Sequence, residues 1–310
     1  QNILRSSGEL VLNGGTYNLT NNGNGVALNF RMSEATLIAN NGTINSINTE
    51  AGKATALQIT GTNSNTTIYN INCFSQTMSG KAVALFAGRS NSTEGISDIR
   101  IDGGNFTCFS KQGNVVTGYF DSKNVTINDG AFNAKNDTGS IVGISVSGEK
   151  NDIIINNVKI NSILTESAST YNYGIYIMGT TNNCQINGGE YYVENNSNNI
   201  KSQAAAIMSY NSNVEINDGS FIADGKLDDE KNTKTLGLIS NSENLVVNGG
   251  YFRGTHSGAI IWGIANVNGG TFESPNHGGM YLGGNVNIKN TTLKLGTYKG
   301  KYSEIENIDH

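Results

Sequence analysis

One eight-residue pattern recurs along almost the whole chain. It reads apolar, any residue, apolar, Asn or Asp, any residue, Gly, any residue, aromatic, as in LVLNGGTY, IRIDGGNF, VTINDGAF, CQINGGEY, VEINDGSF, LVVNGGYF and ANVNGGTF. Alignment on the second Gly, with degenerate copies included, gives positions 15, 42, 72, 104, 130, 158, 189, 219, 250, 270 and 291, in steps of 20 to 32 residues. A repeat of this length indicates a solenoid, in which each turn is one structural unit.

Apolar and polar residues alternate inside each copy. In VEINDGSFIA, Val214, Ile216 and Phe221 would face one way, whereas Glu215 and Ile222 would face the other. A period of two indicates β-strands. The Asn and Gly residues between the two strands are expected to form a bend, because both reach left-handed backbone angles.

Each repeat also contains a strand that begins with a small residue. The copies are ALNF from Ala27, ALQI from Ala56, ALFA from Ala84, GISV from Gly143, GIYI from Gly174, GLIS from Gly237, GAIIW from Gly258 and GMYLG from Gly279. Hairpins would join strands within a few residues, so this period favours turns that stack in parallel. Parallel crossovers are nearly always right-handed. We predict an all-β fold, a right-handed single-stranded parallel β-helix (a solenoid) of about eleven turns.

The domain organisation follows from the extent of the repeat. No change in composition suggests a linker, so residues 1–310 are expected to form a single β-helix domain. Residues 1–9 depart from the repeat and are expected to be an N-terminal cap or lead-in, and residues 296–310 a C-terminal cap or tail. Caps are expected because a β-helix otherwise exposes unpaired strand edges.

The aromatic position of the repeat has the phase of the interior. Stacking of successive turns would bring its residues into one file inside the coil. Cys108 and Cys184 have the same phase and are expected to be buried, and an odd total of three cysteines argues against a disulfide framework. The expected file is Tyr17, Phe74, Phe106, Phe132, Tyr191, Phe221, Phe252 and Phe272, with Ile44, Ile160 and Leu293 in the remaining turns.

The overall charge limits the partners. The chain has 20 Lys and Arg residues against 25 Asp and Glu, a net charge of -5, which argues against nucleic acid as a partner. No apolar run approaches the roughly 20 residues that cross a bilayer, so membrane insertion is not expected. The 39 Gly residues and the abundance of Asn disfavour a helical protein.

Together, the repeats resemble the pectate-lyase-like (pectin-lyase-like) superfamily of right-handed parallel β-helices. The Asn-Gly-Gly-x-aromatic copies are similar to those of large bacterial surface and adhesin-like proteins. The resemblance covers nearly the whole chain and implies the fold. It does not choose a function, because polysaccharide lyases, glycoside hydrolases, phage tailspikes and adhesin stalks share this scaffold.

A glycoside hydrolase would need carboxylates that converge on one face. The only adjacent Asp pair, Asp228 and Asp229, lies in the charged insertion ADGKLDDEKNTKT, which is typical of a solvated loop. The alternative is a calcium site, because hard oxygen ligands cluster there. Its candidate ligands are Asp224, Asp228, Asp229 and Glu230, and Ca²⁺ is the one cofactor that the sequence suggests.

Two further pairs are catalytic candidates. Arg253 and Glu273 should be vertical neighbours on outward positions, either as a surface ion pair or as part of a catalytic group. His256 and His277 each precede the next aligned Gly by 14 residues, so their side chains should stack on adjacent turns. A stacked pair would suit acid–base chemistry or a metal, although a structural role is the alternative.

A column of outward side chains follows the small residue. It is expected to contain Asn29, Gln58, Phe86, Ser145, Tyr176, Ile207, Ile239, Ile260 and Tyr281, with Trp262 two positions further along its strand. Such an apolar stripe is covered by the chain's own loops, contacts a partner or another copy, or stacks on sugar rings. Tyr176, Ile260, Trp262 and Tyr281 are the candidate ligand-binding residues, because Trp and Tyr beside polar groups suit carbohydrate binding.

Three functions are compatible with these features. The first, favoured by the missing catalytic carboxylate pair, is an extracellular, cell-surface module, adhesin- or stalk-like, that binds a polysaccharide or a host or cell-surface protein. The second is a polysaccharide lyase or glycoside hydrolase that uses His256, His277, Arg253 and Glu273. The third is a phage tailspike-like trimer, which would make the chain a homo-oligomer.

Overall fold

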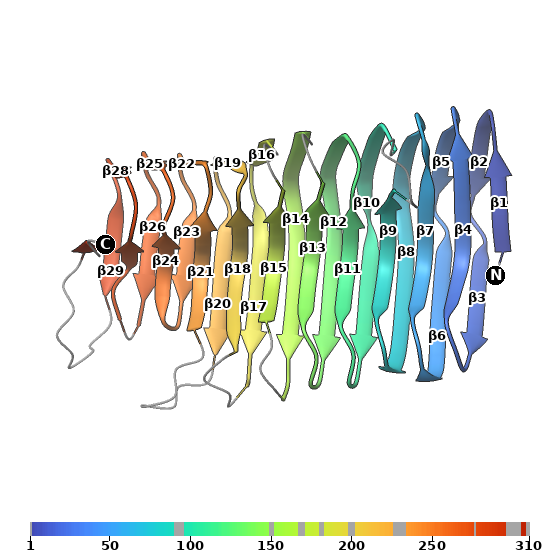
Figure 1. Cartoon of the computed structure of the whole chain (residues 1–310), viewed down its shortest axis with the longest axis horizontal. Coiled ribbons are helices and arrows are strands. Elements are labelled where there is room, and N and C mark those ends of the chain that lie inside the picture. Colours follow the sequence, from blue (N-terminus) through green and yellow to red (C-terminus); the bar gives the residue numbers. More distant parts are fainter. Residues whose placement is uncertain are drawn as a thin grey trace.

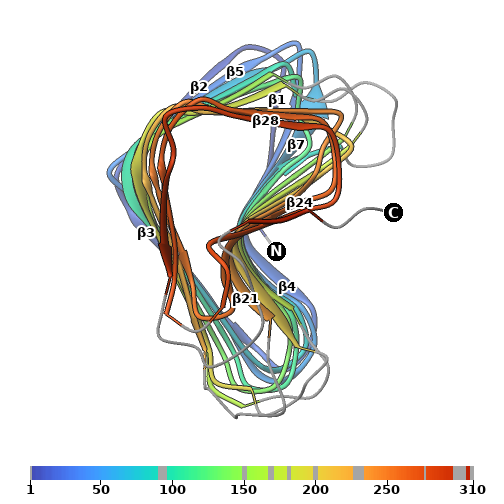
Figure 2. The same cartoon turned by 90° about the vertical axis from the view of Figure 1, so that its left-hand side faces the viewer.

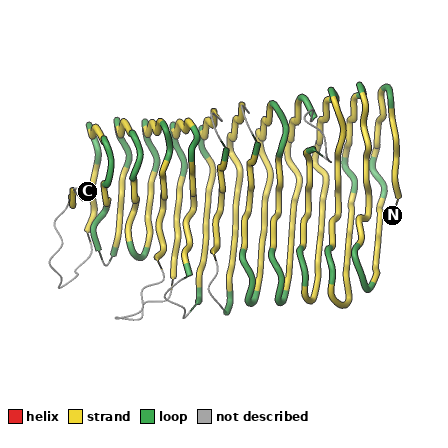
Figure 3. The backbone as a smooth tube through the Cα atoms, in the orientation of Figure 1, coloured by secondary structure: helices red, strands yellow, loops and turns green. Residues whose placement is uncertain are grey.

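The chain coils into a parallel β-helix, as the repeat predicts (Figure 1). The computed structural model describes residues 2–89, 96–148, 152–166, 171–179, 183–197, 202–225, 234–275, 277–295 and 305–307. These residues form strands and connecting turns without a helix, as the tube in Figure 3 shows, and so no helix within them could cross a membrane. The expected all-β fold and its parallel strand stacking are therefore confirmed.

Sheet A contains one strand from each successive turn and has twelve strands. Residues 2–6 and 305–307, which lie in the segments expected to cap the helix, supply its first and last strands. In order, its strands are β1 (Asn2–Ser6), β4 (Gly25–Ser33), β7 (Ala54–Thr62), β9 (Ala82–Gly88), β11 (Val115–Phe120), β13 (Ile141–Ser147), β15 (Tyr171–Met178), β18 (Gln203–Tyr210), β21 (Lys234–Asn241), β24 (Ser257–Ile261), β27 (Met280–Leu282) and β30 (Ile305–Asn307).

Sheet B contains the two strands of the Asn-Gly repeat and bends between them. In the middle turns one long strand runs through the bend: β8 (Asn65–Ser79), β10 (Asp98–Ser110), β12 (Asn124–Asn136) and β14 (Asp152–Leu164). Elsewhere the strand before the bend is β2 (Glu9–Asn13), β5 (Thr36–Asn40), β16 (Asn183–Ile186), β19 (Asn213–Ile216), β22 (Asn244–Val247), β25 (Ala265–Val267) or β28 (Val286–Ile288). The strand after it is β3 (Thr16–Asn21), β6 (Thr43–Ala51), β17 (Gly189–Asn195), β20 (Ser220–Gly225), β23 (Tyr251–Gly254), β26 (Thr271–Ser274) or β29 (Thr292–Leu295).

The aromatic position of the repeat forms a stack inside the coil. From Tyr191 through Phe221 and Phe252 to Phe272, successive ring centroids lie 4.7, 4.8 and 4.7 Å apart with nearly parallel planes. All four side chains are buried. The spacing matches the rise of one turn, so each ring packs on its equivalent in the next repeat.

One member of the expected aromatic file is wrong. Cys73, not Phe74, pairs with Phe106 in the interior register, and Phe74 is half-buried. The bend of this turn passes through Asn70, which has a φ of 49° and lies opposite Gly103. The bend has the same length as that of β10, with Ile68 beside Ile101 and Cys73 beside Phe106, so the sequence alignment was one residue out of phase in this turn. Cys108 and Cys184 are buried free thiols as expected, and burial raises the pKa of each thiol.

At the column of small residues the backbone of sheet A lies directly against the backbone of sheet B. We call this narrow part of the cross-section the waist. A Cβ atom on Gly237 would lie 2.9 Å from the nitrogen of Arg253 and 3.1 Å from the carbonyl oxygen of Phe221. Gly258 is equally close to its facing strand. Figure 2 shows the resulting cross-section, which narrows at its middle on the side where β4, β7, β21 and β24 run. At Gly237 and Gly258 even a Cβ atom would meet backbone, so glycine is required, whereas Ala or Thr117 occupies the column in other turns.

Asparagine side chains form a ladder along the bend of sheet B. Each amide donates to the side-chain oxygen one turn before, and the distances are 2.6 to 3.0 Å. These residues do not have left-handed angles, which belong to the Gly residues that follow every member except Asn156. The ladder therefore explains the conserved phase of Asn within the repeat better than the bend does. Its members are Asp102, Asn128, Asn156, Asn187, Asn217, Asn248 and Asn268.

Candidate functional site

The outer face of sheet A carries the aromatic column. The observed register is Asn29, Gln58, Phe86, Tyr119, Ser145, Tyr176, Met208, Ile239, Ile260 and Tyr281. The assignment of Ile207 was wrong, because Ile207 is buried in the main core and Met208 takes its place. Tyr119 was missed, because its turn begins with Thr117 rather than with Ala or Gly.

The strands bend at the waist, and this brings further side chains onto the same face. Tyr173 comes before the small residue Gly174, and Tyr176 comes after Gly174. The ring centroids of Tyr173 and Tyr176 nevertheless lie 5.5 Å apart. Tyr171 stacks on Tyr173 at 5.1 Å. Three tyrosines of one strand therefore share one outer surface, where strict alternation across the bend would have separated them.

The C-terminal patch is the part of this face between β15 and β27. Its centre is a small hydrophobic cluster, separate from the main core, in which Leu236, Ile239 and Ile260 are buried. Ile260 is 6% exposed, so it supports the surface and offers little area to a ligand. The patch consists of Tyr171, Tyr173, Tyr176, Met178, Met208, Tyr210, Leu236, Ile239, Ile260, Trp262 and Tyr281.

Aromatic side chains at the margin of this cluster are exposed. Tyr171 is 42%, Tyr210 41% and Trp262 40% exposed, and they come from β15, β18 and the end of β24. A Cβ atom on Gly283, in the turn after Trp262, would lie 2.6 Å from the indole Cδ1. The indole therefore lies over a position that only glycine leaves open.

His256 and His277 lie in contact on adjacent turns at one edge of the patch, with their ring planes tilted by 45°. Their ring centroids are 4.6 Å apart, as the 21-residue step predicts, and His256 also lies 5.8 Å from the ring of Tyr281. Burial lowers the pKa of His256 to about 4, with a further contribution from His277 and Lys234. Burial also lowers the pKa of His277. Both imidazoles are therefore held in the neutral form at pH 7.

Arg253 and Glu273 lie in a different group of charged residues. They are register neighbours on β23 and β26, as expected. Arg253, however, forms its ion pair with Asp224 at 3.1 Å, and Glu273 lies 3.8 Å from Lys294. Asp224 and Arg253 both influence the pKa of Tyr192, which burial raises to about 12. The ion-pair interpretation thus fits Arg253, with Asp224 as the partner.

The calcium candidates are only partly within the described structure. Asp224 is engaged by Arg253, whereas Asp228, Asp229 and Glu230 lie outside the described residues. Among the residues that are described, no three His, Cys, Asp or Glu side chains group in a way that could hold a metal ion. The observed role of Asp224 is therefore that of an ion-pair partner.

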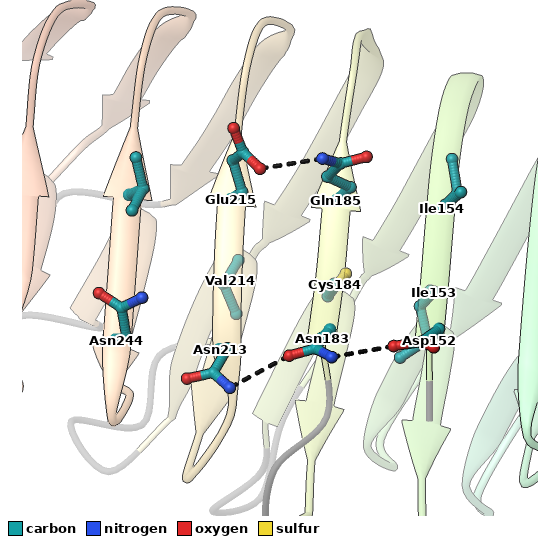
Figure 4. Close-up of a pocket in the computed structure, with 11 residues that line it drawn as sticks. Asp152, Ile153, Ile154, Asn183, Cys184, Gln185, Asn213, Val214, Glu215 and Asn244 are labelled. Atoms are coloured by element: carbon teal, nitrogen blue, oxygen red, sulfur yellow. Dashed lines mark hydrogen bonds between the residues drawn. The ribbon is translucent and has the colours of Figure 1, made fainter. Parts of the chain in front are cut away.

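A cavity of about 510 Å³ lies on sheet B, over β14, β16, β19 and β22 (Figure 4). Its polar side chains bond to one another across the turns. Asn183 donates to Asp152 at 2.9 Å, Asn213 donates to Asn183 at 3.1 Å, and Gln185 donates to Glu215 at 2.9 Å. A ligand here would compete with bonds that the protein already makes, so this cavity is the weaker candidate.

The outer face of sheet A is the candidate site of this parallel β-helix protein. It combines stacked aromatic rings, exposed aromatic side chains and neighbouring polar side chains. Comparison of the chain with protein-family models, with curated proteins and with solved structures found no match.

Proposed function

We propose that this chain is an extracellular β-helix module of a bacterial surface protein, adhesin- or stalk-like, that binds glycan through the C-terminal patch. The observation that supports this most strongly is the pair of exposed rings Tyr210 and Trp262, which follow the same line two turns apart at the ends of β18 and β24, with Tyr171 exposed at the start of β15. Aromatic faces pack against the apolar faces of sugar rings, while tyrosine hydroxyl groups exchange hydrogen bonds with sugar hydroxyls.

The arrangement of the patch suits an extended ligand. Strands of adjacent turns lie about 4.8 Å apart, so the aromatic positions recur along the helix axis at a fixed spacing. The buried centre of Leu236, Ile239 and Ile260 holds the surrounding rings in place. A preformed surface of this kind loses little conformational entropy when it binds.

A glycan panel tests this function. Calorimetry with neutral oligosaccharides is expected to detect a ligand, and Trp262→Ala is expected to weaken its binding by about tenfold or more. Tyr69→Ala is the matched control, because Tyr69 is an aromatic residue of similar exposure, 39%, on sheet B. Retained affinity in Trp262→Ala, or an equal loss in Tyr69→Ala, would refute this site.

The second candidate function is polysaccharide cleavage. The neutral pair of His256 and His277 on adjacent turns favours it, because a neutral imidazole can accept a proton at pH 7. Release of reducing ends or unsaturated uronates from a polysaccharide panel, abolished by His256→Ala or His277→Ala, would replace the binding function with catalysis.

A trimeric spike is the third candidate. It would use the apolar surface of the C-terminal patch between copies of the chain, and a host or cell-surface protein could use the same surface. Analytical ultracentrifugation distinguishes these cases: a mass of three chains, lost in Trp262→Asp, would favour the trimer, and a mass of one chain would exclude it.

A further inference from the structure

A second part of the same face, which we call the N-terminal patch, combines aromatic rings with cationic side chains. It consists of Arg31, Lys53, Lys81, Phe86, Arg89 and Tyr119. At its centre, Phe86 and Tyr119 come from adjacent turns and stack with centroids 5.0 Å apart and planes inclined by 2°. Both rings are half-buried, so each offers part of its surface to solvent.

Two lysines flank the rings on one side. The Lys53 ammonium lies 5.5 Å from the ring centroid of Phe86, and the Lys81 ammonium lies 5.8 Å from that of Tyr119. Partial desolvation lowers the pKa of both, and the charge of Lys53 lowers that of Lys81 further. Within the described residues, the ion pairs include neither lysine. Like charges are therefore held close together without a carboxylate between them.

A cavity of about 500 Å³ lies against Phe86. Phe86 lines it together with Arg31, Gln58 and Arg89, so the cavity and the lysines share the same ring. Arg89 lies 3.3 Å from Asp121, whose pKa burial raises. Arg31 is exposed and, like the lysines, takes no part in the ion pairs of the described residues. The rings of Phe86 and Tyr119 therefore have cationic side chains near them, both from the two lysines and from the arginines that line the cavity.

Asn29, on the strand next to Gln58, has an unsatisfied side-chain amide. It is fully buried and is the register neighbour of Gln58, which lines the cavity. Neither its side-chain nitrogen nor its side-chain oxygen has a hydrogen-bond partner among the residues that the structure describes. Buried amides normally find a partner, but this one is fully buried and does not line the cavity, so Asn29 is not part of the N-terminal patch.

We propose that the N-terminal patch binds a sugar ring that carries a carboxylate or a sulfate, with the sugar against the half-exposed rings of Phe86 and Tyr119 and the anion at Lys53 and Lys81. This rests on the proposed function, in which the face binds glycan, and specifies an anionic class of glycan for these turns. Aromatic stacking alone would accept any sugar. The unpaired cations make the patch selective, because they interact with an anion more strongly than with a neutral hydroxyl.

The charge of the whole chain narrows the ligand. With a net charge of -5, the protein repels polyanions elsewhere on its surface, so a long nucleic acid is disfavoured. The cations of the N-terminal patch come from a few neighbouring turns, and this suits one or two anionic groups. An acidic peptide would satisfy the cations but would leave the flat stacked rings without a flat partner.

Calorimetry with paired probes tests the proposal. A galacturonate hexamer is compared with its fully methyl-esterified form, which keeps the rings and removes the charge. A dextran sulfate oligomer is compared with unsulfated dextran. At least one anionic probe is expected to bind about tenfold more tightly than its neutral counterpart. The stronger of the two identifies carboxylate or sulfate, and its Kd should rise with NaCl.

Variants then place the anionic probe on the patch. Lys53→Met with Lys81→Met removes both charges but keeps the apolar stems, and is expected to weaken binding by about tenfold or more at an unchanged Tm. Phe86→Leu should weaken it as well. Lys159→Met is the control, because Lys159 is an exposed lysine on sheet B that pairs with Glu190. Unchanged affinity in the double variant would overturn the proposal.

Other outcomes separate this proposal from the proposed function. Equal affinity for charged and esterified probes, or tighter binding of a polyglutamate peptide than of either saccharide, would also overturn it. If Trp262→Ala abolishes neutral glycan binding while the double lysine variant leaves the affinity for the anionic probe unchanged, glycan binding by the C-terminal patch is supported and the anionic site is refuted. If only the anionic probes bind, and only the lysine variant weakens them, the anionic site stands without the C-terminal function.

Discussion

The two ends of the outer face of sheet A carry the same arrangement with different chemistry. Each has two basic side chains on adjacent turns beside aromatic rings: Lys53 and Lys81 near the N-terminus, and His256 and His277 near the C-terminus. Ordinary lysine has a pKa of 10.5 and ordinary histidine 6.5, and burial lowers both. At pH 7 the lysines therefore stay cationic, whereas His256 is neutral. The same parallel sheet thus carries a charged surface at one end and an uncharged surface at the other.

The waist shows a second difference between the two ends. Its small residues are alanines in β4, β7 and β9, but glycines in β21, β24 and before β27. At the alanines the facing strands leave room for a methyl group. At Gly258 a Cβ atom would lie 2.7 Å from the oxygen of Gly279 and 2.8 Å from the nitrogen of Glu273. The C-terminal turns are therefore the more tightly closed part of the coil.

Substitution of this glycine should have the largest effect. Gly258→Val is expected to lower the free energy of unfolding by about 3 kcal/mol or more, because backbone cannot move away as a flexible side chain can. Urea denaturation measures the loss. Gly23→Ala is the control, since nothing lies within 4 Å of a Cβ atom there. A Gly258→Val protein as stable as the control would show that the waist can open.

Regular features of the sequence predicted the fold and part of the site. Alternation and the repeat predicted parallel stacking, and counting from the aligned Gly placed His256 beside His277. The predicted register was wrong in a turn where more than one residue could occupy the small-residue position. Three alanines, 204 to 206, made the small residue of β18 ambiguous, and this moved Ile207 into the column in place of Met208.

Interactions between side chains could not be predicted in the same way. Arg253 had Glu273 as its register neighbour, but the longer reach of an arginine brings it to Asp224 on the preceding turn. Burial was misjudged as well, because Ile260 lies on the outer face and is nevertheless covered by its own neighbours. Period and phase determine which face a residue occupies, whereas contacts depend on side-chain length and on the bend at the waist.

Acidification should affect the C-terminal end more than the N-terminal end. The pKa of His256 is about 4 in the folded protein and 6.5 ordinarily, so the unfolded state binds its proton first as the pH falls. Its contribution to stability is complete above pH 6.5 and is lost towards pH 4. The expected loss is about 1 to 3 kcal/mol.

Urea midpoints between pH 7 and pH 4 check this loss. His256→Gln removes the titrating group and should flatten the part of the pH profile that belongs to it. Lys53→Met is the matched control from the other end, because lysine does not change charge in this window, and its profile should parallel that of the parent protein. Parallel profiles for all three proteins would contradict the neutral, buried state of His256.

The smallest expected difference concerns the asparagine ladder, which is also uneven between the two ends. In the N-terminal turns Asn40 donates to Asn13, and Tyr69 occupies the next position, so the ladder stops. From Asp102 onward it continues through Asn268, and Asn187 both donates to Asn156 and accepts from Asn217. Asn187→Ala therefore removes two side-chain hydrogen bonds, whereas Asn40→Ala removes one.

These bonds are exposed to water, so each contributes little on its own. We expect Asn187→Ala to lower the free energy of unfolding by about 1 kcal/mol and Asn40→Ala by about half as much. The loss also leaves the amide of Asn217 without its acceptor, whereas Asn40→Ala orphans only the oxygen of exposed Asn13. Urea midpoints of the two variants, measured side by side, give the difference. Equal midpoints would mean that the continuous ladder adds no cooperativity to the C-terminal turns, and that packing of the aromatic stack alone sets their stability.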